Sequence, residues 1–221
     1  MACERLDCMK EIISCKDEIC QFCNEKRQRL FNYTDGRNIK LVTMGPKGTT
    51  SSMAAEYFKK YALNNMNAAS VEIMLYDTFE SAAVELKKEN ADFILLPNAY
   101  GKMTNFYWDI TLELMFTFII QTPEYGIAAM SLDSVKLKDH VTIATCKAVE
   151  HLVSEMWPKI GMEEKDYTII EAYSTKKSLM LLEEGKVDFA LTNDTSLVGS
   201  NASFITDTMR TEVLWSVFMQ K

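Results

Sequence analysis

One arrangement of residues occurs twice in this chain of 221 residues and constrains its fold more than any other feature. Residues 78–98 read TFESAAVELKKENADFILLPN, and residues 175–193 read TKKSLMLLEEGKVDFALTN. Each segment starts with a threonine, continues as an amphipathic helix, and ends with Asp-Phe, a short apolar strand and an asparagine. Helices that alternate with short buried strands are typical of parallel α/β sheets with right-handed crossovers. The pattern therefore predicts two α/β lobes of similar design.

Further strands and helices surround the two segments. Residues 71–75 alternate between apolar and polar, as a strand does, and Asp77 with Glu80 forms a capping-box pattern for the next helix. Residues 141–146, VTIATC, read as another strand, in which Cys146 is interpreted as a small packing residue. We expect a helical extension over residues 1–38 and a domain over 39–221. Lobe 1 is expected at about 39–112 plus 195–221, and lobe 2 at about 113–194.

Four polar loops follow predicted strands. They are GPKGTTSS (45–52), PNAYGK (97–102), AYSTKK (172–177) and LTNDTS (191–196). In open α/β sheets, ligands bind beyond the carboxyl ends of the strands. The loops therefore predict a ligand cleft between the two lobes.

The loop at 45–52 favours a small anion. It contains two glycines and four consecutive hydroxyl residues, and it leads from an apolar strand into a helix. Backbone N–H groups at the start of a helix attract negative charge. The loop does not end in GK[ST] and has no GxGxxG, which argues against a nucleotide phosphate or a dinucleotide. A carboxylate fits this loop.

The chemistry-bearing residues of the loops are few. Asp194 is the only carboxylate in them, and Tyr100 is their main weak acid. The two histidines, His140 and His151, are interpreted as surface residues, and the chain has no GxSxG, HExxH or EF-hand loop. Such loops suit binding of a carboxylated metabolite and chemistry that depends on positioning and charge stabilisation. We expect no metal site.

Charge and hydropathy exclude several partners. The net charge of −7 and the absence of a basic stripe argue against a nucleic-acid partner. The longest apolar run, residues 114–120, is much shorter than the roughly 20 residues of a membrane helix. Residues 1–8 include three charged side chains and do not resemble a signal peptide. We expect a cytoplasmic protein without a membrane partner.

The N-terminal extension is rich in cysteine. Five of the six cysteines lie in the first 23 residues, and only Cys20 and Cys23 have the CxxC spacing. A zinc site needs a second ligand pair at a suitable distance, for which Cys3 and Cys8 are a poor match. We interpret the segment as an amphipathic helix that covers the domain or a second subunit, which leaves a homodimer open.

Three of these segments are similar to motifs of the prephenate dehydratase family. GPKGTTS (45–51) resembles its GPxGTxS signature, PNAYG (97–101) lies where the family has PxENSxxG, and AYSTKKS (172–178) resembles its Ser-Thr turn before a helix. The resemblance covers about residues 40–221. It implies a two-lobed fold of the periplasmic-binding-protein type II, with prephenate bound between the lobes.

The chain departs from the dehydratases where their chemistry lies. The family's Thr-Arg-Phe triplet falls on Leu214, Trp215 and Ser216, so that an apolar wall replaces a hydroxyl and a guanidinium. These departures are similar to those of the prephenate decarboxylases, which include the bacilysin-pathway enzymes. LYDTFES (75–81), TPEYG (122–126), ALTN (190–193) and the Trp-Ser strand also resemble that group.

The resemblance implies a carboxy-lyase that converts prephenate to a dihydro-4-hydroxyphenylpyruvate without a cofactor, for antibiotic or other specialised amino-acid biosynthesis. A prephenate dehydratase that forms phenylpyruvate and a non-catalytic binding protein for a small carboxylic acid are the alternatives. Asn98, Tyr100 and Asn193 would orient the ring, with Tyr100 as proton relay and Asn98 as the second catalytic position. The residues expected to bind carboxylates are Gly48, Thr49, Thr50, Ser51, Ser174 and Thr175. A plain N-cap is the other interpretation of Ser174, and a loop anchor that of Tyr100.

Overall fold

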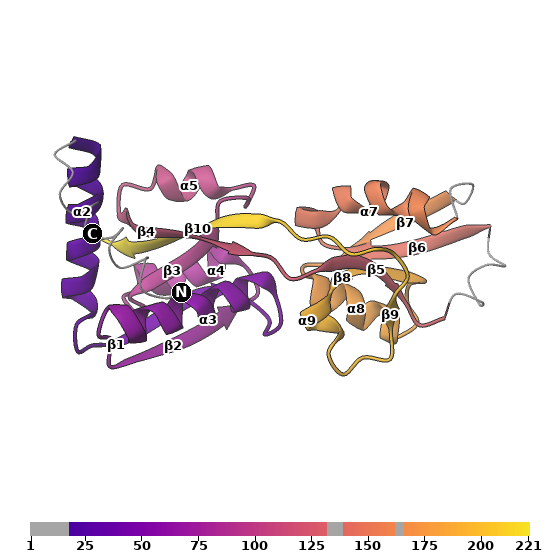
Figure 1. The fold of residues 1–221 in the computed structure, drawn as a ribbon, viewed down its shortest axis with the longest axis horizontal. Coiled ribbons are helices and arrows are strands. Elements are labelled where there is room, and N and C mark those ends of the chain that lie inside the picture. The colour runs from indigo at the N-terminus through magenta and orange to yellow at the C-terminus, as the bar shows by residue number, and fades with distance from the viewer. Residues whose placement is uncertain (1–17, 132–138, 162–165) are drawn as a thin grey trace, which may run out of the picture.

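The computed structural model describes residues 18–131, 139–161 and 166–221, which form two lobes, each built on a five-stranded sheet (Figure 1). The elements of the first lobe are α2 (Glu18–Thr34), β1 (Asn38–Met44), α3 (Thr50–Asn65), β2 (Ser70–Tyr76), α4 (Phe79–Lys87), β3 (Phe93–Pro97), α5 (Met103–Tyr107), β4 (Leu112–Gln121) and β10 (Glu212–Gln220). Those of the second are β5 (Tyr125–Ala129), β6 (His140–Thr145), η1 (Lys147–Val149), α7 (His151–Met156), η2 (Trp157–Ile160), β7 (Asp166–Glu171), α8 (Thr175–Glu183), β8 (Phe189–Asn193), α9 (Asp194–Leu197) and β9 (Ser203–Phe204).

The two sheets share one layout. The first has the order β2-β1-β3-β10-β4, in which β1, β2 and β3 are parallel and β10 is antiparallel to β3 and β4. The second has the order β7-β6-β8-β5-β9, with β6, β7 and β8 parallel and β5 antiparallel to β8 and β9. The predicted α/β class with two lobes of similar design is confirmed. The repeated sequence segments correspond to α4–β3 and α8–β8, at equivalent places in the two sheets.

The chain passes between the sheets twice. β4 pairs with β10 along its whole length, from Leu112 to Gln121, and β9 pairs with β5. The passages therefore lie at residues 122–124 and 205–211. The chain therefore changes from one sheet to the other at different residues from the expected lobe boundaries near 113 and 195. The reason is that β4 belongs to the first sheet through its long-range pairing with the C-terminal strand, which the local sequence pattern does not determine. The division into lobes as domains stays a prediction.

Both faces of the first sheet are buried. Successive residues of β3 and β10 point to opposite faces, as the period of a strand requires. The face toward α3 includes Phe93, Leu95, Trp215 and Val217, which form one core cluster with Phe58 of α3. The face toward α4 and α5 includes Ile94, Leu96 and Phe218, which form another with Phe79 of α4 and Phe106 of α5. Ser216 lies between two residues of the first group and therefore belongs to the face under α5.

The helix α4 begins one residue later than the sequence predicted. Thr78, rather than Asp77, is the N-cap: its hydroxyl accepts a hydrogen bond from the Ser81 N–H at 3.0 Å, and the Ser81 hydroxyl accepts one from the Thr78 N–H. Ser81 therefore completes the capping box in place of Glu80. The Glu80 carboxylate is free to contact the loop after β3.

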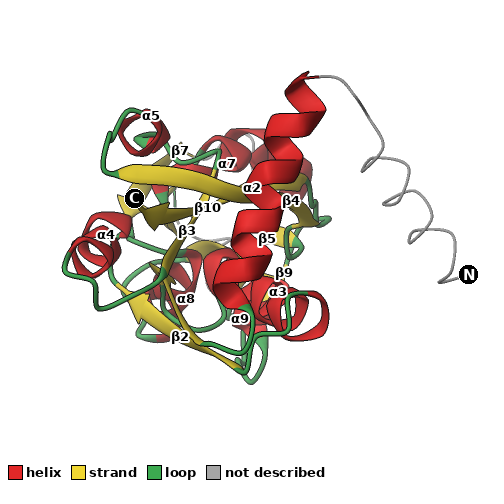
Figure 2. Cartoon of the chain, turned by 90° about the vertical axis from the view of Figure 1, so that its left-hand side faces the viewer, coloured by secondary structure: helices red, strands yellow, loops and turns green. Residues whose placement is uncertain are grey.

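The helix α2 lies across one end of the first lobe, as Figure 2 shows in front of β4. Leu30 is fully buried in the core under α3, and Lys26 and Arg29 both form ion pairs with Glu113 of β4. This half of the predicted extension is therefore part of the first lobe. The remainder, with Cys3, Cys8 and Cys15, lies outside the described residues.

Candidate active site

The loop after β1 leads into α3 through a tight turn. Gly48 adopts φ +91°, which a glycine tolerates. Thr49 is the N-cap of α3: its hydroxyl accepts a hydrogen bond from the Ser52 N–H at 3.2 Å and donates one to the Pro46 carbonyl at 2.9 Å. The Thr49 hydroxyl thus uses its only proton and one acceptor position locally, and the neighbouring Ser51 is buried. The Ser52 N–H is taken by this cap, whereas the N–H groups of Thr50 and Ser51 have no partner within the helix and can receive an anion.

This loop contacts the second lobe directly. The Thr50 hydroxyl forms a hydrogen bond of 2.5 Å with the hydroxyl of Tyr125 on β5. The Gly48 carbonyl accepts a hydrogen bond from the Thr195 hydroxyl of α9 at 3.0 Å and a longer one from Ser196 at 3.4 Å. Gly48 and Thr50 therefore lie at the junction between the lobes.

The second lobe brings its own polar residues to the same junction. Ser174 is the N-cap of α8 and accepts a hydrogen bond from the Lys177 N–H at 3.2 Å. Asn193 is fully buried: its Nδ2 donates to the Thr175 hydroxyl at 3.1 Å, and its Oδ1, 2.9 Å from the Thr195 hydroxyl, shares the single proton of that hydroxyl with the Gly48 carbonyl. Because Thr195 also contacts Gly48, one network connects Thr175 and Asn193 to the loop of the first lobe.

Two weak acids at this junction are held neutral. Burial raises the pKa of the Tyr125 hydroxyl above its usual value of 10.0, and burial also raises the pKa of the Cys146 thiol at the end of β6. Both groups therefore keep their protons at neutral pH. Cys146 has the properties of an unreactive thiol, and its packing role stays a prediction.

A second group of predicted residues lies at the carboxyl end of β3. The Asn98 side chain donates from Nδ2 to the Tyr107 hydroxyl at 2.9 Å and accepts at Oδ1 from the Ser216 hydroxyl at 2.7 Å. The two hydroxyls, of Tyr107 and Ser216, are 3.1 Å apart and complete a ring of three hydrogen bonds. Ser216 is fully buried, whereas Tyr107 is 45% exposed. This Asn98–Tyr107–Ser216 group joins a loop, a helix and the terminal strand.

Tyr100 contacts a different part of the first lobe. Its hydroxyl donates to Glu80 Oε1 at 2.7 Å, and its ring packs on Phe79 with 4.8 Å between centroids. Burial and the hydrogen bond to Glu80 raise the pKa of Tyr100 far above its usual value. These contacts are those of a loop anchor, which was one of the two interpretations from the sequence. Its catalytic role stays a prediction.

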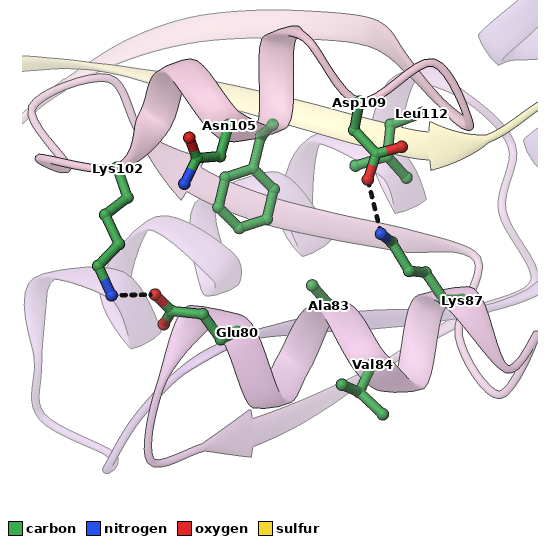
Figure 3. Close-up of a pocket in the computed structure, with 9 residues that line it drawn as sticks. Glu80, Ala83, Val84, Lys87, Lys102, Asn105, Asp109 and Leu112 are labelled. Atoms are coloured by element: carbon green, nitrogen blue, oxygen red, sulfur yellow. Dashed lines mark hydrogen bonds and ion pairs between the residues drawn. The ribbon is translucent and has the colours of Figure 1, made fainter.

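A shallow groove of about 240 Å³ lies between α4 and the segment around α5 (Figure 3). Figure 3 shows an ion pair at each end, Lys102 with Glu80 at 2.8 Å and Lys87 with Asp109 at 2.6 Å. Ala83, Val84, Phe106 and Leu112 form its apolar lining. The two ion pairs connect α4 to the chain before and after α5, the helix that carries Tyr107.

The three residues of β10 that replace the dehydratase triplet have different surroundings. Leu214 is 38% exposed, and its carbonyl accepts a hydrogen bond from the Asn98 N–H at 2.8 Å. Trp215 is 1% exposed and packs in the core with Phe58 and Phe93. The expectation that Trp215 forms part of a wall beside the substrate is therefore corrected: strand alternation turns it away from Leu214 and Ser216.

Most of the predicted site residues thus fall into two groups in the structure, while Tyr100 contacts Glu80 and Phe79 and Trp215 lies in the core. Gly48, Thr50, Thr175 and Asn193 meet at the junction between the lobes, with Thr49, Ser51 and Ser174 at the starts of the adjoining helices. Asn98 and Ser216 meet at the end of β3, with Leu214 beside them. Sequence reasoning quoted Tyr125 inside TPEYG and Thr195 inside the loop LTNDTS (191–196) without giving either a role, and it passed over Tyr107 entirely. Only the folding back of α5 brings Tyr107 to Asn98.

The part of the chain that the structure describes contains no group of three or more His, Cys, Asp or Glu side chains arranged to hold a metal ion. Among the described residues, no helix combines the length and apolar character that a membrane crossing requires.

The class of fold is that of prephenate dehydratases and periplasmic binding proteins. A prephenate dehydratase from Arthrobacter aurescens, solved with L-Phe, superposes with a TM-score of 0.53 at 13% identity; the match covers 83% of this chain, which spans 61% of that protein. A putative methionine-binding lipoprotein from Bacillus subtilis superposes with a TM-score of 0.52 at 10% identity, over 80% of this chain and 82% of the other. The two-lobed type II binding-protein fold is confirmed.

Curated relatives indicate which proteins within this fold class have a similar sequence. The chain is 27% identical to a prephenate decarboxylase of Planktothrix agardhii over 189 residues, which are 85% of this chain and 91% of the relative. It is 28% identical to a prephenate decarboxylase of Bacillus subtilis over 181 residues, 81% of this chain and 86% of the relative. No family model matches the chain. The predicted resemblance to prephenate decarboxylases of the bacilysin-pathway type is confirmed.

Proposed function

We propose that this protein removes the ring carboxylate of prephenate as CO2 without aromatising the ring, and so forms a dihydro-4-hydroxyphenylpyruvate. The observation that carries the proposal is the similarity to prephenate decarboxylases over more than four fifths of the chain. The product would feed antibiotic or other specialised amino-acid biosynthesis.

The reaction mainly requires that the protein position the substrate. Prephenate carries a ring carboxylate and a pyruvyl group on one ring carbon, and a hydroxyl on the opposite carbon. When CO2 leaves, the ring diene accepts the electron pair, so the step does not require a cofactor. The enzyme needs to bind the pyruvyl tail firmly and leave the departing carboxylate poorly solvated, so that binding energy is used in the transition state.

The junction between the lobes supplies the groups for the pyruvyl tail. α3 and α8 both start there, and their first N–H groups favour a carboxylate. Thr50 and Thr175 add hydroxyls, and Asn193 holds Thr175 in place through a hydrogen bond of 3.1 Å. Thr49, Ser51 and Ser174 contribute by shaping the helix starts. Since the Thr50–Tyr125 contact crosses from one lobe to the other, substrate binding and closure of the lobes would be linked.

The Asn98–Tyr107–Ser216 group supports retention of the ring hydroxyl. None of its three side chains is a cation such as the guanidinium of the dehydratase triplet, and the adjacent Leu214 is apolar. Expulsion of hydroxide needs a strong donor to the leaving oxygen, and removing one such donor typically costs about 2.7–4 kcal/mol in a transition state. Decarboxylation with retention of the hydroxyl therefore competes well at this site.

A cytoplasmic location and a homodimer belong to the proposal as predictions. Light scattering coupled to size-exclusion chromatography measures the mass in solution, and a mass near 25.2 kDa would contradict the dimer.

The experiment that tests the function uses purified protein and prephenate at neutral pH, with CO2 release followed over time and the organic product identified by NMR. We expect CO2 release and a product that keeps its ring hydroxyl. An Asn193→Leu variant, which keeps the branched shape of the side chain and loses the amide, should lose substrate affinity. Tight binding without CO2 release would indicate a binding protein, and would overturn the proposal.

A further inference from the structure

The hydroxyl of Tyr107 is held at the point where two predicted site segments meet. Asn98 Nδ2 donates to it at 2.9 Å, and the Ser216 hydroxyl lies 3.1 Å from it. Since Ser216 uses its only proton in the hydrogen bond of 2.7 Å to Asn98 Oδ1, the Tyr107 hydroxyl is the donor in its contact with Ser216. These hydrogen bonds thus define the direction of the Tyr107 hydroxyl proton and hold the hydroxyl oxygen in place.

The end of β3 points toward the second lobe. The loop after β1 reaches Tyr125 and Thr195 of that lobe, so the carboxyl end of β1 faces the junction. β3 runs parallel to β1, and Asn98 follows β3 immediately. The carboxyl end of β3, with Asn98 and its partner Tyr107, therefore lies on the side of the first sheet that faces the junction, where ligands of such sheets bind.

The surroundings of Tyr107 suit a group that gives up a proton and regains it. The ring packs edge-on against Phe218, 5.4 Å between centroids, which fixes its direction. After proton loss, the tyrosinate oxygen would keep the hydrogen bond from Asn98, and the Ser216 hydroxyl could rotate to donate a second one. Because Tyr107 is 45% exposed, solvent can return the proton.

Tyr100, the sequence-based choice for this role, is less suited to it. Its hydroxyl donates to the Glu80 carboxylate, and Glu80 also receives a hydrogen bond from Lys102. A neighbouring negative charge opposes formation of a tyrosinate. Tyr107 has two neutral partners, Asn98 and Ser216, in place of a carboxylate.

We propose that Tyr107 is the catalytic acid that protonates the ring carbon during decarboxylation. This inference rests on the proposed function. The bond from the ring carbon to the carboxylate breaks, and its electron pair forms a new double bond to the adjacent ring carbon. The two electrons of the original ring double bond take the proton from Tyr107. The new C–H bond forms at the carbon of that double bond that lies next to the hydroxyl-bearing carbon. CO2 leaves, the ring keeps its hydroxyl, and water restores the proton of the tyrosinate.

The test compares wild type, Tyr107→Phe and Tyr57→Phe with prephenate, and reads kcat and KM for CO2 release together with thermal stability. Tyr57 is the matched control because it is 47% exposed on α3 and stacks on Phe118. We expect kcat of Tyr107→Phe to fall by about 10²–10⁴-fold, the usual contribution of a positioned acid, with KM within about threefold. Tyr57→Phe should match wild type.

Each outcome has a separate meaning. A wild type that releases no CO2 defeats the proposed function itself. A wild type that turns over while Tyr107→Phe keeps its kcat within about threefold overturns the role of Tyr107 alone, and a large loss in Tyr100→Phe instead would return the role to Tyr100. If Tyr107→Phe does not fold, kcat of the Ser216→Ala variant is measured instead. We expect this kcat to fall about tenfold, because the tyrosinate loses one hydrogen-bond donor. An unchanged kcat contradicts the inference.

Discussion

At the scale of single residues, several side chains predicted to bind substrate also fix the backbone. Thr49, Ser174 and Asn193 each cap a helix start, and their oxygen atoms accept backbone N–H groups of the first turn. Ser, Thr and Asn are common at such positions for this reason alone. Their presence in the sequence could therefore predict helix starts securely, and ligand contacts only through the resemblance.

Substitutions of the neighbouring residues Thr49 and Thr50 distinguish helix capping from substrate binding. Thr49→Ala removes an N-cap and should lower the free energy of unfolding by about 1 kcal/mol, within the usual range of about 0.5–2 kcal/mol. Thr50→Ala removes the contact to Tyr125 and should raise the Kd for prephenate by roughly tenfold, because a hydrogen bond of this kind contributes about 1.5 kcal/mol. Urea unfolding and calorimetric titration measure the two effects. Equal stability and equal affinity losses in both variants would contradict this separation.

At the scale of elements, α2 and α5 owe their positions to contacts far away in the sequence. α2 packs on β4 through Leu30 and through the ion pairs of Glu113. α5 is enclosed by the Lys102–Glu80 and Lys87–Asp109 ion pairs. Local patterns predicted the helices and strands of the two repeated segments well. They carried no signal for these long-range contacts, and so Tyr107 went unnoticed.

The attachment of α2 can be measured through Leu30. This side chain is fully buried, and Leu30→Ala should lower the free energy of unfolding by about 2–5 kcal/mol, the usual cost of such a cavity. Gln28→Ala is the control on the same helix, because Gln28 is exposed and forms a hydrogen bond with Asn32 one turn away, so that its loss should cost below about 0.5 kcal/mol. Equal and small losses in the two variants would show that α2 does not stabilise the first lobe.

The ion pair between Lys87 and Asp109, beside α5, makes the free energy of unfolding depend on pH. The hydrogen bond from Lys87, with help from Thr111, lowers the pKa of Asp109 from 3.8 to about 2. A carboxyl with a lowered folded-state pKa stabilises the fold above its unfolded pKa and loses that effect as pH falls from about 4 to 2. Because Lys87 is half exposed, solvent screening reduces the contribution to about 1 kcal/mol. Asp109→Asn should remove this part of the acid sensitivity in urea unfolding. An unchanged pH profile would contradict the assignment.

At the scale of the whole molecule, the chain builds one five-stranded layout twice and joins the two copies at residues 122–124 and 205–211. The repeated helix–Asp-Phe–strand–Asn pattern was sufficient to predict two α/β lobes, because each copy encodes its own helix and buried strand. The position of Trp215 in the core could not be predicted from an aligned motif. It depends on which face of β10 meets α3, and only the pairing of β10 with β3 and β4 decides this.

The central claim is that the site removes CO2 and keeps the ring hydroxyl, and the product ratio measures it most directly. Prephenate is incubated at pH 8 with wild type and with Leu214→Thr, and the dihydro-4-hydroxyphenylpyruvate and phenylpyruvate are integrated by NMR. Trp215 is left unchanged because an arginine in the core would unfold the lobe. We expect a ratio above about 100:1 in wild type, which needs only about 2.7 kcal/mol between the two routes. Leu214→Thr should lower the ratio. Phenylpyruvate as the main wild-type product would contradict the account and assign the protein to the dehydratases.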